Sequence, residues 1–320
     1  AGWRAWTRLP LVVSTGTACA MGPACNKRQP TERGSAFAHT EFPLSSSTIL
    51  EVRSGLGWPK MLRGAYDDIV DGLRRWRTWT YLSSHDIRRQ YQRSLLGPFW
   101  LTLNMGILVG ALGWFYAGVF GQAIDTFLPY VALGFMVFGL ISAIINESCT
   151  VFSGAAASIK QSQLPLSFYV FKLLSRHVIA FVHNFAIYVI VWLIFPIPLG
   201  WSVLLAIPGL MLILISGFFA ALLIGPIAAR FRDIPPIVGS IMQIFFFLTP
   251  IFWSAEVLSD RAYFVHVNPF YHYLELVRRP LMGGIPSDLS WIVAGSTTLF
   301  VAVIAFIFFA RYRAQIAYWA

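Results

Sequence analysis

The chain alternates between long stretches without charged residues and short segments that carry nearly all of its charge. Five uncharged stretches are evident: 94–124, 126–146, 177–229, 234–255 and 289–310. A membrane-spanning helix needs about 20 mainly apolar residues, so each stretch is long enough to cross a bilayer. The third is long enough for two crossings, and the sequence FPIPLG at 195–200 divides it.

The pattern therefore predicts six membrane-spanning helices. Their expected ranges are 97–120, 127–147, 178–195, 203–228, 237–254 and 289–310. Apolar residues follow one another in these runs without the alternation of a transmembrane β-strand, which favours a helical bundle over a β-barrel. The predicted fold class is all-α and integral to the membrane, with the six spans within residues 96–320.

Composition supports a membrane as the surrounding solvent. Of the 320 residues, 57% are hydrophobic and only 12% are charged, and the mean hydropathy is +0.65. A soluble domain carries about a quarter of its residues as charges. Half that share, together with the long apolar runs, places most of the chain in lipid.

The net charge of +10 follows the predicted topology and is not gathered as in a nucleic-acid-binding protein. Eight basic residues lie in 60–95, and others follow the even-numbered spans: Lys160, Lys172, Arg176, Arg230, Arg232, Arg311 and Arg313. The loop after the first span carries only Asp125, and the loop after the third carries no charge. Because basic residues favour the cytoplasmic side, both termini are predicted to be cytoplasmic.

Residues 1–60 differ from the remainder of the chain. They are rich in Ser, Thr, Gly and Pro and show no sustained periodicity. Three interpretations stay open: a disordered extension, an upstream translation of a frame that begins at Met21 or Met61, and a signal peptide with a small-residue site at Ala18-Cys19-Ala20.

Residues 61–95 predict an amphipathic helical region before the first span. Tyr66, Ile69, Val70, Leu73 and Trp76 recur at helical spacing, while charged residues fill the other face. An arginine-bearing helix with tryptophan on its apolar face is typical of the lipid headgroup plane. Packing on a cytoplasmic partner is the alternative.

Glycines recur inside two of the predicted spans. Gly106 and Gly110 form a G-x-x-x-G pattern, and Gly209, Gly217 and Gly225 recur every eight residues. Small residues let helices approach closely in lipid. Packing within the chain and packing between two copies both fit this pattern.

No catalytic or metal-binding constellation emerges. The sequence has no phosphate-binding loop, no H-E-x-x-H and no paired carboxylates within a span, and its three cysteines lack disulfide or metal spacing. Ion-driven transporters place ionisable residues at membrane depth, where this chain has almost none. We therefore predict a transport subunit without enzymatic activity or a cofactor of its own, which takes energy from a separate ATP-binding chain. A secondary transporter and a membrane-embedded glycan transferase are disfavoured alternatives.

The segment ARFRDIPP at 229–236 interrupts two apolar runs with concentrated charge. Its arginines and Asp233 are expected to form one turn between the fourth and fifth spans, which Pro235 and Pro236 end. This turn would present fixed charges to another protein. A plain basic loop that only sets topology is the alternative.

Several segments together resemble the membrane subunit of type-2 ABC exporters. They are DIRRQYQRSLLGPFW at 86–100, IKQSQLP at 159–165, ARFRDIPP, FFFLTPIFW at 245–253, NPFYHYLELVRRPLMG at 268–283 and ARYRAQIAYW at 310–319. The most similar branch is the polysaccharide and polyol phosphate export permeases, which move O-antigen, capsule and teichoic acid chains. The resemblance covers about residues 64–320.

The resemblance implies a homodimer in the bacterial inner membrane, docked to a separate ABC ATPase chain that binds ATP and Mg²⁺. A channel for a lipid-linked polysaccharide would form between the two copies. Coupling to the ATPase would fall to Arg230, Phe231, Arg232, Asp233, Lys160 and Gln161. Residues 256–286 would form outer re-entrant helices between the fifth and sixth spans. A permease for a drug or a small lipid is the alternative.

Aromatic residues make up 16% of the chain and gather near the ends of spans. Anchoring at the membrane surface is their ordinary role. Trp100 lies near the substrate entry that the resemblance implies. On the outer side we hypothesise a guide for an exiting glycan, because aromatic rings offer an apolar face and a polar edge to sugars. Its residues would be Tyr271, Tyr273, Arg278 and Arg279.

Overall fold

The computed structural model of the chain describes residues 57–320 apart from 93, 95–96, 98 and 254–262. The interpretations of residues 1–56 therefore concern residues outside the described part. The described residues belong to one compact unit. Within its described residues the secondary structure is helical throughout, without a β-strand, as the sequence predicts.

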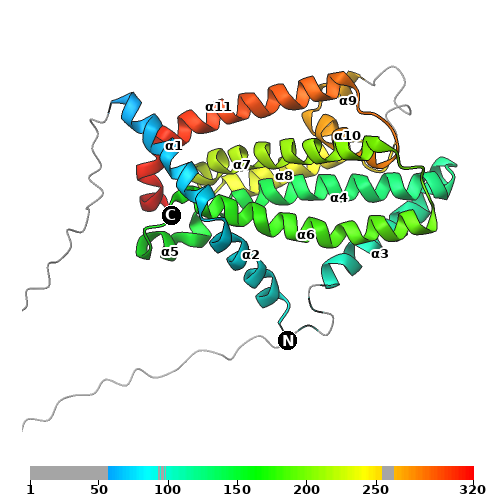
Figure 1. Cartoon of the computed structure of the whole chain (residues 1–320), viewed down its shortest axis with the longest axis horizontal. Helices are drawn as coiled ribbons and strands as arrows, with labels where there is room; N and C mark the ends of the chain where they lie inside the picture. The colour runs from blue at the N-terminus through cyan, green and yellow to red at the C-terminus, as the bar shows by residue number, and fades with distance from the viewer. Residues whose placement is uncertain (1–56, 93, 95–96, 98, 254–262) are drawn as a thin grey trace, which may run out of the picture. The chain divides into compact units, whose positions relative to one another are not determined.

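The helices follow one another along the chain as Figure 1 shows. They are α1 (Trp58–Arg74), α2 (Trp76–Gln90), α3 (Phe99–Phe120), α4 (Ile124–Ser148), α5 (Ala156–Gln161), α6 (Leu166–Ile194), α7 (Ala206–Arg230), α8 (Ile234–Leu248), α9 (Tyr263–Val267), α10 (Pro269–Leu281) and α11 (Asp288–Trp319). Two 3₁₀ turns, η1 (Ser153–Ala155) and η2 (Trp201–Leu205), precede α5 and α7.

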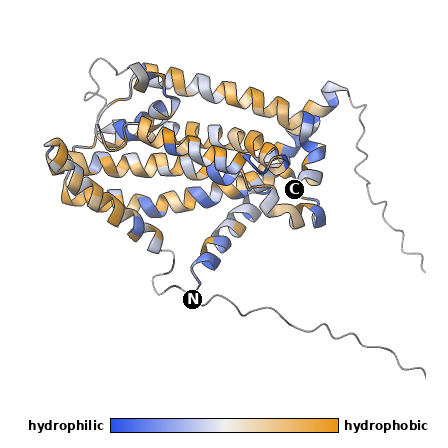
Figure 2. Ribbon diagram, turned by 180° about the vertical axis from the view of Figure 1, so that it is seen from behind, coloured by the Kyte–Doolittle hydropathy of each residue, from blue (hydrophilic) through white to orange (hydrophobic). Residues whose placement is uncertain are grey.

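Five of the described helical segments are long and apolar enough to cross a membrane. They are α3, α4, α6, η2 with α7 (Trp201–Arg230), and α11. Hydrophobic residues dominate these helices in Figure 2, whereas α1 and α2 are more hydrophilic. The chain is a multi-pass membrane protein.

The predicted span at 237–254 differs from these five. Its helix α8 has 15 residues, fewer than the about 20 that a spanning helix needs. The helix ends at Leu248 because Pro250 follows, which disfavours a helical conformation at Thr249. Thr249 is extended, with φ −92° and ψ 133°. The structure therefore supports five long spans directly.

Helix α6 begins at Leu166, twelve residues before the span predicted at 178. Lys172 and Arg176, which the charge pattern places in a loop, lie inside this helix. Lys172 forms a 2.7 Å ion pair with Asp86 of α2, and Arg176 pairs with Glu147 at the end of α4. Neighbouring helices thus neutralise charges that appear as a loop signal in the sequence.

Helix α4 is the central helix of the bundle. Every residue from Val131 to Phe138 is buried, and α3, α6, α7, α8 and α10 pack around the helix. The glycine repeat of α7 serves this packing. A Cβ added at Gly209 would lie 2.7 Å from the main-chain oxygen of Leu276 in α10, and one at Gly217 would lie 2.9 Å from Ile144 in α4.

The amphipathic region forms two helices that break at Arg75, and both pack on α6. Asp68 of α1 fixes this arrangement. Its carboxylate accepts hydrogen bonds from the main-chain N–H groups of Leu166 and Ser167 at 3.2 and 2.9 Å, where α6 begins. Arg313 of α11 donates to the carbonyl of Gly64 and lies 3.5 Å from Asp68. Helix α1 is thereby joined to α6 and α11.

Candidate coupling and gating sites

The turn between α7 and α8 contains the charges of ARFRDIPP. Helix α7 ends at Arg230, and α8 begins at Ile234 with Pro235 in its first turn, a position where proline fits a helix. Phe231, Arg232 and Asp233 between them are exposed. Neither Arg232 nor Asp233 forms an ion pair with another described residue. The turn therefore presents one positive and one negative side chain to the solvent.

Arg230 differs from Arg232 because its guanidinium contacts the protein itself. The guanidinium lies 5.1 Å from the centre of the Trp319 ring and 5.5 Å from that of Phe231. A cation over an aromatic face is attracted by the electron density of the ring. This contact joins the end of α7 to the last turn of α11.

Lys160 and Gln161 end the short helix α5, and both are exposed. Helix α5 packs on α11, and Figure 1 shows it beside the C-terminal end of that helix. The two segments predicted to couple to an ATPase, one in α5 and one between α7 and α8, therefore lie at the same end of the bundle. We call it the basic end, since Lys160, Arg232 and Arg313 all lie there.

A charged cavity of about 290 Å³ lies at the basic end between α2, α4 and α6. Asp86, Glu147, Lys172 and Arg176 line it and form two ion pairs. His177 adds its Nε2 atom 2.7 Å from the Glu147 carboxylate. The sequence alone gives no sign of this cavity, because the charged residues that line it come from three separate helices.

An open groove of about 430 Å³ runs between α4 and α8 at the level of the membrane-spanning helices. Aromatic residues line it together with uncharged polar residues: Phe135, Phe138, Phe246, Ser142, Asn146 and Gln243. Only Met242 of α8 is buried, while Ile237, Ile241, Ile244 and Phe247 on that helix are exposed. Amides and hydroxyls are unfavourable in contact with lipid chains. The groove is therefore suited to contact another protein chain or a polar ligand.

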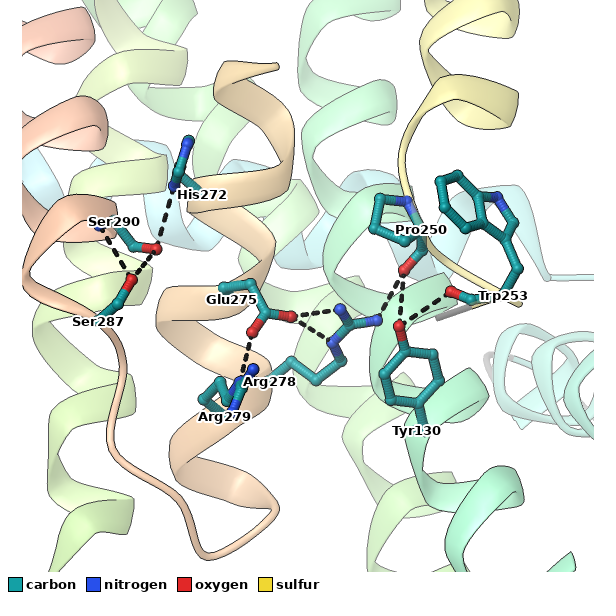
Figure 3. A network of polar contacts seen from close by, with 9 residues as sticks. All are labelled: Tyr130, Pro250, Trp253, His272, Glu275, Arg278, Arg279, Ser287 and Ser290. Atoms are coloured by element: carbon teal, nitrogen blue, oxygen red, sulfur yellow. Dashed lines mark hydrogen bonds and ion pairs between the residues drawn. The ribbon is translucent and has the colours of Figure 1, made fainter. Parts of the chain in front are cut away.

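The opposite end of the bundle contains α10, whose polar residues form the network in Figure 3. Glu275 accepts hydrogen bonds from Arg278 and, at 2.7 Å, from Nε of Arg279. The residue Arg278 is 2% exposed, whereas 61% of the Arg279 side chain is exposed. Burial alone would raise the pKa of Glu275, but the two arginines lower it below its ordinary value.

Three of the four residues predicted to guide a glycan are buried. The hydroxyl of Tyr273 contacts Ser216, Thr298 and the carbonyl of Ala294 at 2.8–3.2 Å, so it bridges α7 and α11. Tyr271 is 9% exposed. In this conformation Arg279 alone of the four offers its side chain to a ligand. Trp100 lies elsewhere, in the first turn of α3, which packs on α4 and α6.

Comparison with known families gives a result that fits this architecture. The family model for the ABC-2 type transporter matches residues 77–282. The chain belongs to the ABC-2 type transporter family. A search of the curated proteins gave no match. Membership makes the chain the membrane subunit of an ABC transporter and implies an ABC ATPase as its partner.

The sites differ in how far they could be predicted from the sequence alone. The two segments predicted to couple this ABC-2 type permease to an ATPase carry exposed charges near prolines, which is a local signal in the sequence. The α4–α8 groove and the network around Arg278 depend on contacts between distant segments. Uncharged polar residues in apolar spans, Asn146 and Gln243, were the available signal for the groove.

Proposed function

We propose that the chain is the permease subunit of an exporter for a lipid-linked polysaccharide such as O-antigen or capsule. Two copies would form the transport path, and a separate ATPase chain would bind ATP and Mg²⁺ and drive it. The single observation that favours this substrate class is the composition of the α4–α8 groove. Aromatic rings stack on the apolar faces of sugars, and amides and hydroxyls bond to their hydroxyl groups.

A homodimer in the bacterial inner membrane accounts for the position of the groove. A second copy that covers the exposed face of α8 would shield Asn146 and Gln243 from lipid and close the groove into a path. Ion pairs are few at this level in the described residues, so the path would be neutral. A charged carrier phosphate would then lie at the membrane interface, beside the neutral path and near the basic residues of α1 and α2.

We infer six crossings with both termini on the cytoplasmic side. Helix α8 would complete its crossing through the non-helical residues 249–253. Irregular backbone at membrane depth requires that its carbonyl groups be satisfied by protein. The carbonyl groups of Pro250 and Trp253 do accept hydrogen bonds from Arg278 and Tyr130. Basic residues at the end with α1 and α5 favour that end as cytoplasmic, and α9 and α10 would then be the outer re-entrant part.

Deletion of the gene in its own host tests the substrate class. We expect surface polysaccharide to be lost on blots and lipid-linked polymer to accumulate inside, with both defects restored by the gene. Unchanged surface polysaccharide would contradict the proposal. Sensitivity of the deletion strain to a drug, or a change in membrane lipids alone, would favour the corresponding alternative substrate.

Coupling to the ATPase is proposed for Arg230, Phe231, Arg232, Asp233, Lys160 and Gln161, because these residues lie at the basic end and most are exposed. Exchange of the charges in Arg232→Asp with Asp233→Arg should abolish export while the protein stays inserted. The matched control is the exchange Asp71→Arg with Arg74→Asp, an exposed surface pair at 3.8 Å on α1. Full export by the first variant would leave the turn as a topology signal only.

A further inference from the structure

Helix α8 connects two features described above. One is the turn at 231–233 between α7 and α8, which we call the coupling turn, and the other is the network around Arg278. The helix begins directly after Asp233 at the basic end and ends at Leu248, next to Thr249 and Pro250. Along its length it packs on α4 and α7 with little burial. Within the described residues, no side-chain hydrogen bond joins α8 itself to another helix. The helix is therefore held more weakly than the segment that follows it.

The residues that follow α8 are held firmly. Thr249 and Ile251 are fully buried. The guanidinium of Arg278 donates to the Pro250 carbonyl at 2.7 Å, and the Tyr130 hydroxyl donates to the Pro250 and Trp253 carbonyls at 3.2 and 3.0 Å. These donors come from α10 and α4, so the chain after α8 is fixed to two other helices (Figure 3).

The fixation is rigid because Arg278 cannot rearrange at low cost. Its guanidinium lies 3.9 Å from the centre of the Tyr130 ring and is paired with Glu275. A buried charge that loses one of its partners keeps its desolvation penalty without compensation. Asn268 adds a further bond, from its amide to the Thr249 hydroxyl at 2.8 Å. Contacts from Tyr130 of α4, from Arg278 of α10 and from Asn268 at the start of α10 thus fix one short segment.

We propose that Arg278 and Tyr130 are positioning residues of the transport cycle, which fix the outer end of α8 so that the helix pivots about residues 249–253. This proposal rests on the proposed function. Movement of the coupling turn by the ATPase would displace the weakly held helix at its Ile237 end. The outer end would stay in place, so the displacement would widen the α4–α8 groove from the basic end.

The choice of a pivot over a sliding rod follows from the contacts. A rod that slides would break the bonds to Pro250 and Trp253 at each cycle and leave Arg278 without an acceptor. A pivot leaves these bonds intact and repacks only exposed or half-buried apolar residues of α8. Repacking of such residues within an interface exchanges similar contacts and costs little.

Spin-label distances in the complex of the permease with its ATPase chain test this. The background chain carries serine in place of its three cysteines, and labelled subunits are diluted with unlabelled ones. One pair of cysteines replaces Ile237 and Ile285, and another replaces Phe247 and Ile285; all three positions are exposed. On trapping with ATP and vanadate, we expect the first distance to change by about 2–5 Å and the second by less than about 1 Å.

The variant Tyr130→Phe removes the hydroxyl that the Pro250 and Trp253 carbonyls share as a donor and keeps the ring next to Arg278. We expect it to broaden the Phe247–Ile285 distances about twofold and to let that end move with the nucleotide. The matched control is Tyr188→Phe, since the Tyr188 hydroxyl donates to the Leu281 carbonyl at the end of α10 and not to the residues after α8. The control should behave as the parent.

Each other outcome has a definite meaning. Equal shifts at both ends in the parent would overturn the pivot, as would identical distances in Tyr130→Phe and Tyr188→Phe. ATP hydrolysis without any shift along α8 would also overturn it and leave the proposed function intact. A permease that binds no ATPase chain would instead refute the proposed function, and the pivot with it.

Discussion

Two largely buried carboxylates lie at opposite ends of the bundle, and their partners differ in kind. Asp68 at the basic end accepts from two main-chain N–H groups of α6 and faces Arg313, whose side chain is 37% exposed. Glu275 at the opposite end compensates Arg278, whose side chain is 3% exposed. The first joint is made mostly of neutral donors, and the second is an ion pair removed from water.

This difference predicts how each end responds to force. Hydrogen bonds from main-chain N–H groups to the Asp68 carboxylate contribute about 1.5–3 kcal/mol each, and at a partly exposed joint water can replace them. A buried ion pair is costly to separate, because either partner alone is an uncompensated charge. The basic end is therefore the adjustable end, where an ATPase would act, and the end with α10 is the fixed one.

Removal of the Glu275 charge should have the largest effect. In Glu275→Gln, Arg278 keeps its buried charge without a carboxylate, which costs about 3–5 kcal/mol. We expect a large loss of folded protein and a lower unfolding temperature in detergent, measured by size-exclusion chromatography after heating. Arg279→Gln is the control, since an ion pair with an exposed partner contributes at most about 1 kcal/mol. Similar stability of both variants would remove the proposed difference between the ends.

Glycine substitutions compare close packing at the two ends and should have the next largest effect. Gly209→Ala directs a methyl group at 2.7 Å from a main-chain oxygen of α10, which cannot move alone. Overpacking of this kind costs about 1–3 kcal/mol. At Gly72 of α1 the nearest atom is the hydroxyl of Ser167, which can rotate, although the main-chain nitrogen of Phe168 lies at 3.1 Å. We therefore expect Gly72→Ala to lower the unfolding temperature less than Gly209→Ala does.

Gly110→Ala is the control for both, since a Cβ there meets nothing within 4 Å. Alanine favours a helix over glycine by about 1 kcal/mol, so this variant should be neutral or slightly stabilising as an isolated subunit. A strong loss of stability in Gly110→Ala but not in Gly209→Ala would contradict the inference that helices pack more closely at Gly209 than at Gly110.

Asp68→Asn should have a smaller effect that is confined to the basic end. Asparagine keeps one acceptor for the N–H groups of α6 but loses the charge opposite Arg313, and loss of one such cap costs about 1 kcal/mol. We expect faster hydrogen exchange in α1 while the exchange of α10 stays unchanged. Asp67→Asn is the control, because Asp67 is exposed on the same helix. Faster exchange across the whole bundle would show that the basic end is not a separate joint.

The sequence predicted those features of the architecture that depend on one continuous segment, and it missed those that depend on contacts between distant segments. Charge-free runs predicted the long apolar helices well, and Pro235 with Pro236 located the start of α8 within a few residues. The start of α6 was missed because Lys172 and Arg176 form ion pairs with Asp86 and Glu147 on other helices. A pattern along one segment contains no information about such partners.

The network around Arg278 shows the same limit more clearly. The sequence has Glu275 three and four residues before Arg278 and Arg279, a spacing that places all three on one helical face. It gave no indication that Arg278 is buried under Tyr130, which is distant in the chain, or that it bonds to the Pro250 carbonyl. These tertiary partners decide whether Arg278 contacts a ligand or stabilises the fold.

Acid should have the smallest effect and the most selective one. Burial would raise the pKa of Glu275, but Arg278 and Arg279 lower it below the ordinary value of 4.5. A carboxyl group with a lowered pKa in the folded state contributes stability above its unfolded pKa and loses it as the pH falls through the folded value. The difference in unfolding temperature between the parent chain and Glu275→Gln should thus stay constant from pH 7 to about pH 5. It should shrink only below pH 4.5, because protonated Glu275 resembles glutamine. A difference that shrinks already near pH 6 would mean that the arginines do not hold Glu275 ionised, and the fixed end would lose the feature that distinguishes it from Asp68.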